Sequence, residues 1–337
     1  MKVYCGLPRD NLKDIPKLAK AAEELGFDGI SFGELAHDSF LLSTLALEHT
    51  KKIKVGTSIA IAFARSPMVS AYMSWDLQRM SDGRFELGLG SQVKGHNERR
   101  FGVQWSAPAP RIKEYVESIR AIWDCWQNGS QLNYQGKHYS ITLMTPEFNP
   151  GPLDCEQPPI YIAAVGEAMT RVAGNVCDGI LLHSFNNKRY VDEIILPNIE
   201  EGANSSGRNI EDISVSGGGM IATGATEEQV AQQREICRKR ISFYGSTRSY
   251  KTVMDMHEWG DTCLRLHEMS KEGKWDEMPN LIDDTMVDTF SVSGTYKEIG
   301  PSLKERFGEY ASRISIGLPS DVKDYNDVGD LLSYLHK

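Results

Sequence analysis

The sequence predicts an α/β fold, a closed (β/α)8 TIM barrel, on three observations. Short apolar runs alternate with amphipathic stretches along most of the 337 residues, which is the pattern of parallel strands joined by right-handed crossovers. About eight strand–helix units can be counted, the number that a closed barrel requires. The first run, Lys2–Gly6, leads into Gly6-Leu7-Pro8 rather than into the Gly-rich loop of an open doubly wound sheet. We therefore expect one barrel domain over residues 1–337.

Hydrophobic periodicity places the elements of the first half of the chain. Strands are predicted at Lys2–Gly6, Asp28–Phe32, Ile53–Ile61 and Arg84–Leu89. The helices between them are predicted at Ile15–Leu25, Phe40–Thr50 and Met68–Ser81. Gly26 stands where a C-terminal cap would end the first of these helices.

The second half continues the alternation and carries two insertions. Strands are predicted at Ile160–Ala164, Gly179–His183, Ile213–Ala222 and Ala311–Gly317. Helices are predicted at Ile112–Trp126, Ala168–Val176, Tyr190–Gly202, Glu227–Phe243 and Tyr296–Phe307. A β-hairpin near residues 131–144 precedes a Pro-rich linker. The polar stretch near 245–288 is too long for an ordinary barrel loop, so we predict a helical insertion there, either a lid or interface element or peripheral packing.

Composition excludes several classes of protein. The formal charge is −9 and no basic stripe is visible, so we expect no nucleic-acid partner. The six cysteines form no CxxC pair and no zinc-like cluster with histidine, and are expected to be reduced packing residues. The first residues lack the apolar core of a signal peptide, and no run reaches the roughly 18 apolar residues of a membrane span. We expect a cytoplasmic protein with no membrane partner.

Polar and small residues follow the predicted strands, where a TIM barrel carries its active site. Glu34 and His37 follow the second strand as candidates for hydrogen bonding or proton transfer, and Asp38 is expected to cap the next helix. The first strand lacks the HxH pair of a metallohydrolase barrel, so no metal site is predicted.

Two loops have the composition of ligand contacts. After the fourth strand, the glycines of Leu87-Gly88-Leu89-Gly90 let a flat ligand or a phosphate approach the backbone. After the fifth, Ala164-Val165-Gly166 opens into a helix, whose free N–H groups and dipole favour a phosphate. No HExxH or Walker motif is present.

Several runs together resemble the luciferase-like monooxygenase superfamily. They are VGTSIAIAFARSP, LQRMSDGRFELGLGSQ, NERRFGV, PRIKEYVESIRAIWD, PPIYIAAVGEAMTRVAGNVCDGILLHSF and SVSGTYKEI. Within the superfamily, the sequence is most similar to the oxidoreductases that depend on coenzyme F420, a deazaflavin. The likeness extends over most of the chain, with the motifs in the same order. It implies a hydride-transferring enzyme that acts on a small organic substrate.

The resemblance also implies site residues. Family members commonly have a non-prolyl cis peptide after the third strand, and the matching bond here is Ser58–Ile59. The positions that match cofactor contacts are Leu89-Gly90 and Ala164-Val165-Gly166, the latter for the phosphate, and Glu34 matches an acidic residue near the ring. Relatives suggest a homodimer.

Two positions depart from the deazaflavin-dependent sugar-phosphate dehydrogenases. Leu35 and Ser91 stand where those enzymes carry a histidine and a glutamate, so we do not expect sugar-phosphate chemistry. The alternatives to the F420 enzyme are an FMN-dependent monooxygenase and, as a different class, a non-catalytic flavin-binding barrel.

Proton transfer is assigned to residues near the ring of the expected cofactor. Histidine has its unperturbed pKa near neutral pH, which suits a general acid or base. His96 and Gln92, in the loop after Gly90, are the first candidates, and His37 is the next. His183, at the end of a predicted strand, is interpreted as a packed structural residue.

Overall fold

Eight parallel strands close into a barrel in the computed structural model, which describes residues 1–8 and 10–337. The strands are β1 (Lys2–Gly6), β2 (Gly29–Phe32), β3 (Lys54–Thr57) continued by β4 (Ala60–Ile61), β5 (Phe85–Gly90), β8 (Ile160–Ala164), β9 (Gly179–Leu182), β10 (Ser214–Gly217) and β13 (Arg313–Gly317). Each strand pairs in parallel with its neighbours, and β13 returns to pair with β1 over five positions. The predicted TIM barrel is confirmed.

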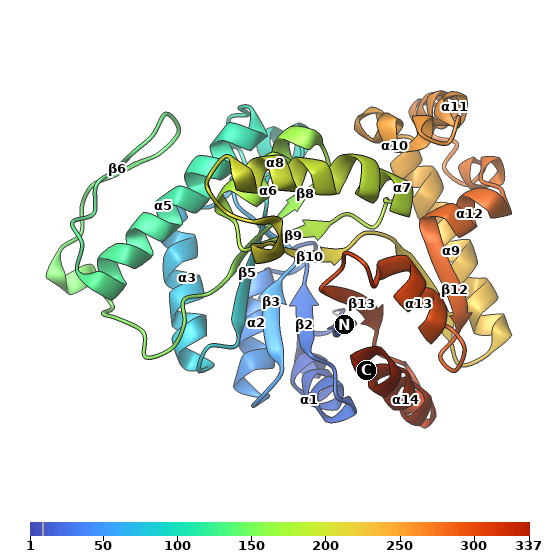
Figure 1. The fold of residues 1–337 in the computed structure, drawn as a ribbon, viewed down its shortest axis with the longest axis horizontal. Helices are drawn as coiled ribbons and strands as arrows, with labels where there is room; N and C mark the ends of the chain where they lie inside the picture. The colour runs from blue at the N-terminus through green and yellow to red at the C-terminus, as the bar shows by residue number, and fades with distance from the viewer. Residues whose placement is uncertain (9) are drawn as a thin grey trace.

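Helices surround the strands (Figure 1). They include α1 (Ile15–Leu25), α2 (Ser39–Glu48), α3 (Pro67–Met80), α5 (Pro108–Asn128), α6 (Glu167–Val176), α8 (Leu196–Asn204) and α13 (Gly300–Phe307). The predicted caps are confirmed: Gly26 ends α1 at φ 93°, a left-handed conformation that favours glycine, and Asp38 accepts hydrogen bonds from the first backbone N–H groups of α2. The C-terminal helix α14 (Tyr325–His336) was not predicted.

The third strand is divided at the position that the resemblance indicated. A cis peptide bond joins Ser58 and Ile59, between β3 and β4. The backbone N–H of Ser58 donates to Phe32 O at 2.7 Å, and Ile59 O accepts from the N–H of Glu34 at 3.1 Å. The last residue of β2 and Glu34 therefore hydrogen-bond to the two residues of the cis bond.

One strand prediction is wrong. Residues 213–222 do not form one strand, because Gly217 and Gly218 have φ values of +77° and +109°, which break the extended backbone. The barrel strand β10 stops at Gly217, and β11 (Met220–Gly224) leaves the barrel to pair with β12 (Ser291–Thr295). This second, two-stranded sheet was not predicted.

Both insertions are present. The hairpin consists of two-residue strands, β6 (Tyr134–Gln135) and β7 (Ser140–Ile141), and extends away from the barrel at the left of Figure 1. The second insertion follows α9 (Glu227–Gly245) and contains α10 (Lys251–Asp255), α11 (Gly260–Lys271) and α12 (Asp284–Phe290). With α9 and β12 these helices form the lobe at the right of Figure 1.

No helix in the described part of the chain combines the length and apolar character that crossing a lipid bilayer needs. All six cysteines are free thiols.

Candidate active site

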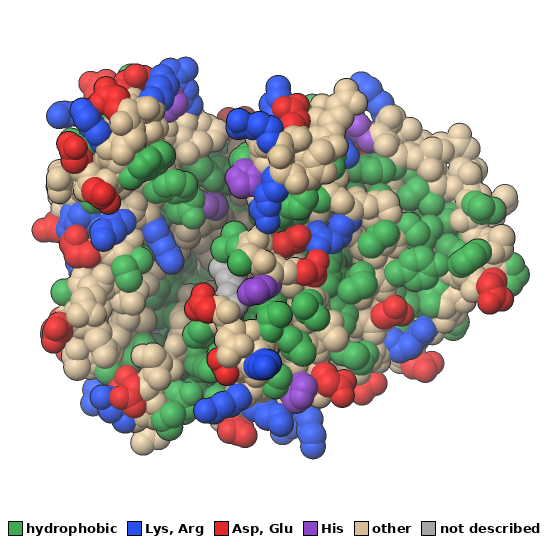
Figure 2. Space-filling model, turned by 180° about the vertical axis from the view of Figure 1, so that it is seen from behind, with side chains coloured by type: hydrophobic (Ala, Val, Ile, Leu, Met, Phe, Trp, Pro, Cys, Tyr) green, Lys and Arg blue, Asp and Glu red, His purple; other side chains and the backbone are tan. Residues whose placement is uncertain are grey.

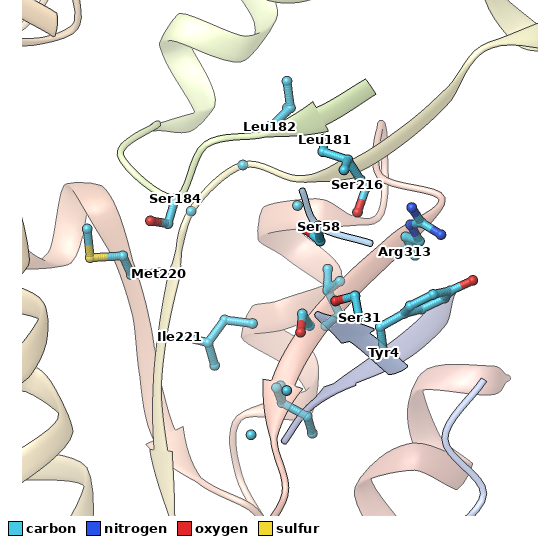
Figure 3. A pocket seen from close by; sticks show the side chains of 18 of the residues that line it. Tyr4, Ser31, Ser58, Leu181, Leu182, Ser184, Ser216, Met220, Ile221 and Arg313 are labelled. Atoms are coloured by element: carbon cyan, nitrogen blue, oxygen red, sulfur yellow. The ribbon is translucent and has the colours of Figure 1, made fainter. Parts of the chain in front are cut away.

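A cavity of about 490 Å³ occupies the centre of the barrel and opens toward α9. TIM-barrel interiors are usually filled by bulky branched side chains. Here serines and glycines take many of the inward positions, including Ser31, Ser58, Ser216, Ser315, Gly6, Gly56 and Gly317. Figure 3 shows the labelled serines around this space, and Figure 2 shows the groove between the α9–α12 lobe and the barrel body. Small side chains thus leave room for a ligand.

A buried ion pair closes the lower end of the cavity. The guanidinium of Arg313 bonds to the carboxylate of Glu86 and lies between the rings of Tyr4 and Tyr161, 4.3 and 4.2 Å from their centroids. The Tyr4 hydroxyl donates to Glu86 Oε1 at 2.9 Å. Burial lowers the pKa of Arg313, but the adjacent carboxylate outweighs burial and the net pKa is raised. Arg313 therefore remains protonated, and its contacts with Glu86, Tyr4 and Tyr161 form the floor of the barrel.

At the opposite end of the cavity, β5 packs closely against the third strand around the Ser58–Ile59 bond. A Cβ on Gly90 would lie 2.7 Å from side-chain atoms of Ile59, and one on Gly88 would lie 2.0 Å from Thr57 O. The Thr57 hydroxyl donates to Gly88 O at 2.7 Å and accepts from Gly88 N at 2.9 Å. Only glycine allows the fourth strand to approach the third this closely. The predicted contact residues Ser58, Ile59 and Gly90 are thus brought together.

Glu34 lies at the same edge and is already paired. Its carboxylate accepts from Ile61 N at 2.9 Å and from Arg65 at 2.8 and 3.0 Å. Burial lowers the pKa of Arg65, but its hydrogen bonds and charge interactions with Glu34 and Asp38 outweigh burial and raise the pKa. Glu34 therefore fixes the backbone beside the cis bond.

The fifth-strand loop exposes the start of α6. Gly166 precedes the helix, no side chain caps its first turn, and a Cβ on Gly166 would meet nothing within 4 Å. The uncapped N–H groups give this end a partial positive charge. Val165 O accepts from the Tyr190 hydroxyl at 3.2 Å, which anchors the loop. Ala164, Val165 and Gly166 thus lead to an accessible helix N-terminus, whose partial charge favours an anion.

Leu89 differs from the other predicted contact residues. Its side chain is fully buried in the hydrophobic core. Because β5 alternates its side chains, the glycines on either side face the barrel and Leu89 faces the helices. Only the backbone of Leu89 can meet a ligand.

The predicted catalytic residues lie on two touching segments near the strand ends. His96 is on a short helix, α4 (Lys94–Arg99), rather than in a loop, and is exposed. The Gln92 side chain accepts from Val93 N at 2.9 Å, and His37 is half-buried. Arg100, just after α4, donates to Leu35 O at 3.0 Å and so joins this segment to the loop of His37. His96, Gln92 and His37 are not among the described residues that line the central cavity.

His183 directly follows β9, between Leu182 and Ser184, which both line the cavity, but it is not itself among the described lining residues. Its Nδ1 accepts from Phe185 N at 3.0 Å. The ring stacks on Tyr250, with centroids 5.2 Å apart, and meets Tyr244 edge-on at 4.5 Å. Burial lowers the pKa of His183 to about 4, so the imidazole is neutral near pH 7.

The sequence did contain signals for the residues that were missed. Glu86 and Arg313 are charged residues inside runs predicted as barrel strands, where a charge requires a partner. The rings beside His183 had no local signal, because Tyr250 belongs to the distant insertion. Among residues 1–8 and 10–337, no group of three or more His, Cys, Asp or Glu side chains is placed to hold a metal ion.

Comparisons of sequence agree with this architecture. A family model described as luciferase-like monooxygenase matches residues 3–313. The chain is 45% identical over 296 residues to an uncharacterised protein of Mycobacterium tuberculosis (strain ATCC 25618 / H37Rv), covering 88% of this chain and 87% of that protein. It is 26% identical over 308 residues to 5,10-methylenetetrahydromethanopterin reductase of Archaeoglobus fulgidus, covering 89% and 88%.

Solved structures share the fold over nearly the whole chain. The coenzyme F420-dependent tetrahydromethanopterin reductase from Methanopyrus kandleri has a TM-score of 0.80 at 21% identity, covering 99% of this chain and 98% of that chain. The oxygenating constituent of 3,6-diketocamphane monooxygenase from Pseudomonas putida, in complex with FMN, has a TM-score of 0.67 at 16% identity, covering 100% and 97%. At these identities the likeness concerns the fold.

Proposed function

The chain belongs to the luciferase-like monooxygenase family, and from this premise we propose that it is a coenzyme F420-dependent oxidoreductase. In this proposal it transfers a hydride between the bound deazaflavin and a small organic substrate. The observation that carries the proposal is the pairing of an open central cavity with an uncapped helix end at the same mouth of the barrel. The likeness to F420-dependent reductases favours the deazaflavin over other flat cofactors.

The residues at the mouth fit such a cofactor. The Ser58–Ile59 backbone would form one wall for a flat ring, with the Ile59 side chain packed against Gly90. Ala164, Val165 and Gly166 would hold the phosphate, since the first turn of α6 leaves its N–H groups free. When bound, the cofactor supplies the hydride chemistry, and the protein supplies orientation and proton transfer. Glu34 would act here by fixing the backbone beneath the ring.

Proton transfer is proposed for His96, with Gln92 and His37 beside it. Support comes from the contact of Arg100 with Leu35 O, which holds the segments of His96 and His37 together at the mouth. The exposure of His96 lets it exchange protons with solvent. Substrate would have to approach from this side for His96 to reach it.

A flavin monooxygenase that uses reduced FMN and oxygen is the second candidate. The observation that favours it is the likeness in fold to a monooxygenase solved with FMN. The proposed phosphate site would serve either cofactor, because both carry a phosphate at the corresponding end. Cofactor preference therefore distinguishes the two candidates.

We also propose a homodimer, formed through a face that carries apolar residues of α3. Val69, Met73 and Met80 are exposed by 49%, 36% and 44%, and their spacing places them along one side of the helix. Phe148, beyond the hairpin, is exposed by 65%. Figure 2 shows a broad band of apolar side chains on the half of the molecule that carries α3 and the hairpin. A surface of this kind typically marks a protein interface.

The test is calorimetric titration of the purified protein with coenzyme F420 and FMN, side by side. We expect tighter binding of F420. Tight FMN binding with none of F420 would replace the proposal with the monooxygenase.

A Gly166→Asp variant tests the phosphate site. Its carboxylate would cap α6, which stabilises the helix by about a few tenths of a kcal/mol relative to glycine, but would compete with the cofactor phosphate. We expect affinity to fall at least tenfold, about 1.4 kcal/mol, without loss of thermal stability. Ala107→Asp is the matched control, since Ala107 precedes α5 and also leaves its helix without a side-chain cap. Equal affinity in both variants would contradict the assigned phosphate site.

A further inference from the structure

A second cavity, of about 360 Å³, lies beside the central one, and we call it the side cavity. Its walls come from β11, from the first half of α9 and from the segment 317–324 that ends β13 and follows it. Ile221, Thr223, Gln233 and Gly317 line both cavities. The two cavities therefore meet along one set of side chains, at the end of the barrel where the strands finish.

One carboxylate faces the side cavity without a counter-ion. Asp324 lines the cavity and is 7% exposed. It stands at the cap position of α14, but its side chain accepts no hydrogen bond from that helix, and Lys323 pairs with Asp321 instead, at 2.8 Å. Among residues 1–8 and 10–337 no hydrogen bond or ion pair reaches the Asp324 side chain, and its oxygens are not fully enclosed. Since a buried charge without a partner is costly, this carboxylate indicates a ligand.

Two hydroxyls face the same space. Thr223 Oγ1 is enclosed and has no hydrogen-bond partner in the described part of the chain. Tyr296 is 9% exposed and lines the side cavity, and nothing within residues 1–8 and 10–337 is hydrogen-bonded to its hydroxyl. Burial raises the pKa of Tyr296, and the negative charge of Asp324 raises it further, so the hydroxyl and the carboxylate are close enough to interact. Three groups with oxygen acceptors thus surround one volume.

The charge of the lining favours a cationic ligand. No Lys, Arg or His is present among the described residues that line the side cavity, whose other polar side chains are three glutamine amides and a serine hydroxyl. A single carboxylate is too few for Ca²⁺ or Mg²⁺, which take about six oxygen ligands, and the described chain groups no three His, Cys, Asp or Glu side chains for a metal. An ammonium group has three N–H donors and no acceptor, which matches the three groups with acceptors.

We propose that the side cavity binds the ammonium group of a small organic amine, and that this group anchors the substrate of the enzyme. The inference rests on the proposed function and adds the substrate class to it. The ammonium donates hydrogen bonds to Asp324, Tyr296 and Thr223, and the carbon skeleton passes Ile221 into the central cavity, where Met220 offers a further apolar contact. No bond to the nitrogen changes, because the ammonium is a recognition group remote from the hydride transfer.

Binding of simple probes to the wild-type protein tests the charge and the path. Dissociation constants are measured by ligand-observed NMR for hexylammonium, hexanol, hexanoate and methylammonium. We expect hexylammonium to bind at least tenfold more tightly than hexanol or hexanoate, because neither of these pairs with a carboxylate. Methylammonium should bind at least tenfold more weakly than hexylammonium, since it lacks the methylenes that contact apolar side chains. Equal binding of hexylammonium and hexanol, or of the two ammonium ions, would overturn the inference.

Three variants locate the probe. Asp324→Asn should weaken hexylammonium binding at least tenfold without lowering the thermal stability, because the carboxylate has no described partner to lose. Asp321→Asn is the matched control, since it removes a charge close by and retains an acceptor for Lys323 N, now at 3.0 Å; it should keep wild-type affinity. Thr223→Val removes the unpartnered hydroxyl at constant shape and should weaken binding severalfold. Wild-type affinity in Asp324→Asn, or equal losses in Asp324→Asn and Asp321→Asn, would contradict the assigned site.

Titration with coenzyme F420 separates this inference from the proposed function. We expect hexylammonium to bind equally well to the free protein and to protein saturated with F420. Loss of amine binding on saturation would assign the side cavity to the cofactor and overturn the inference. Binding of F420 without any binding of hexylammonium would also overturn it, and would leave the proposed function standing. Binding of hexylammonium without any binding of F420 would contradict the proposed function and support the ammonium site.

Discussion

Acidification is expected to destabilise the fold through His183. In the unfolded chain its imidazole has the ordinary pKa of 6.5, whereas burial lowers the pKa to about 4 in the folded protein. The unfolded state therefore binds a proton more readily than the folded state. The contribution of His183 to stability is fully present above about pH 6.5 and is lost as the pH falls toward about 4.

The magnitude follows from the two pKa values. Their difference corresponds to about 3 kcal/mol, and about 2 kcal/mol of it is lost by about pH 5, where the unfolded imidazole is mostly protonated and the folded one mostly neutral. Protonation of Nδ1 would also remove the acceptor of the Phe185 N–H. The loss is therefore specific to this side chain.

Urea unfolding, followed by tryptophan fluorescence at about pH 7.5 and about pH 5, measures the effect. The control is His183→Asn, which cannot titrate and retains an acceptor for Phe185 N. Wild type should lose about 2 kcal/mol more than the variant between the two pH values. Identical pH dependence in the two proteins would refute the reasoning, because His183 would then titrate equally in the folded and unfolded states.

Three further predictions address the barrel base, proton transfer and the interface. Glu86→Gln leaves the guanidinium of Arg313 buried without its counter-ion and should lower the free energy of unfolding by about 3–5 kcal/mol, and a loss under about 1 kcal/mol in urea unfolding would contradict this. His96→Ala should lower kcat roughly 10²-fold with F420 affinity unchanged, as for a lost general acid or base; near-normal turnover would make His96 a bystander. Met73→Lys should convert a dimer to a monomer in light scattering, because it places a charge in the proposed apolar interface, and a persistent dimer would exclude this face.

The barrel could be predicted from sequence because its signals are local. Strands such as Lys2–Gly6 and Ile160–Ala164 have the predicted bounds, since short apolar runs between helical patterns specify them. The wrong strand at 213–222 shows the limit of this approach. Its β-branched and small residues suit a strand, but two glycines with positive φ turn the backbone out of the barrel. The missed strand β12 is rich in serine and glycine and has no alternating apolar pattern.

The site was predicted in part, for a similar reason. Loops that follow strands could be located, so Gly90 and Gly166 were found at the barrel mouth. The environment of His183 could not be predicted, because its neighbours Tyr244 and Tyr250 are distant in sequence and no spacing rule relates them to β9. His183 was interpreted as structural because its packing was expected, whereas the rings that enclose it depend on tertiary contacts.

The ion pair at the barrel base constrains how the polypeptide is made. Glu86 and Arg313 are 227 positions apart in the sequence. β1 can pair with β13 only after residues 313–317 have been synthesised. A nascent chain therefore carries an unneutralised carboxylate and open strand edges until the ribosome has added residues 313–317. Ring closure is consequently a late, nonlocal event, and exposed edges invite pairing with other chains before it. We therefore expect that an interruption of translation before residues 313–317 leaves a chain prone to aggregate.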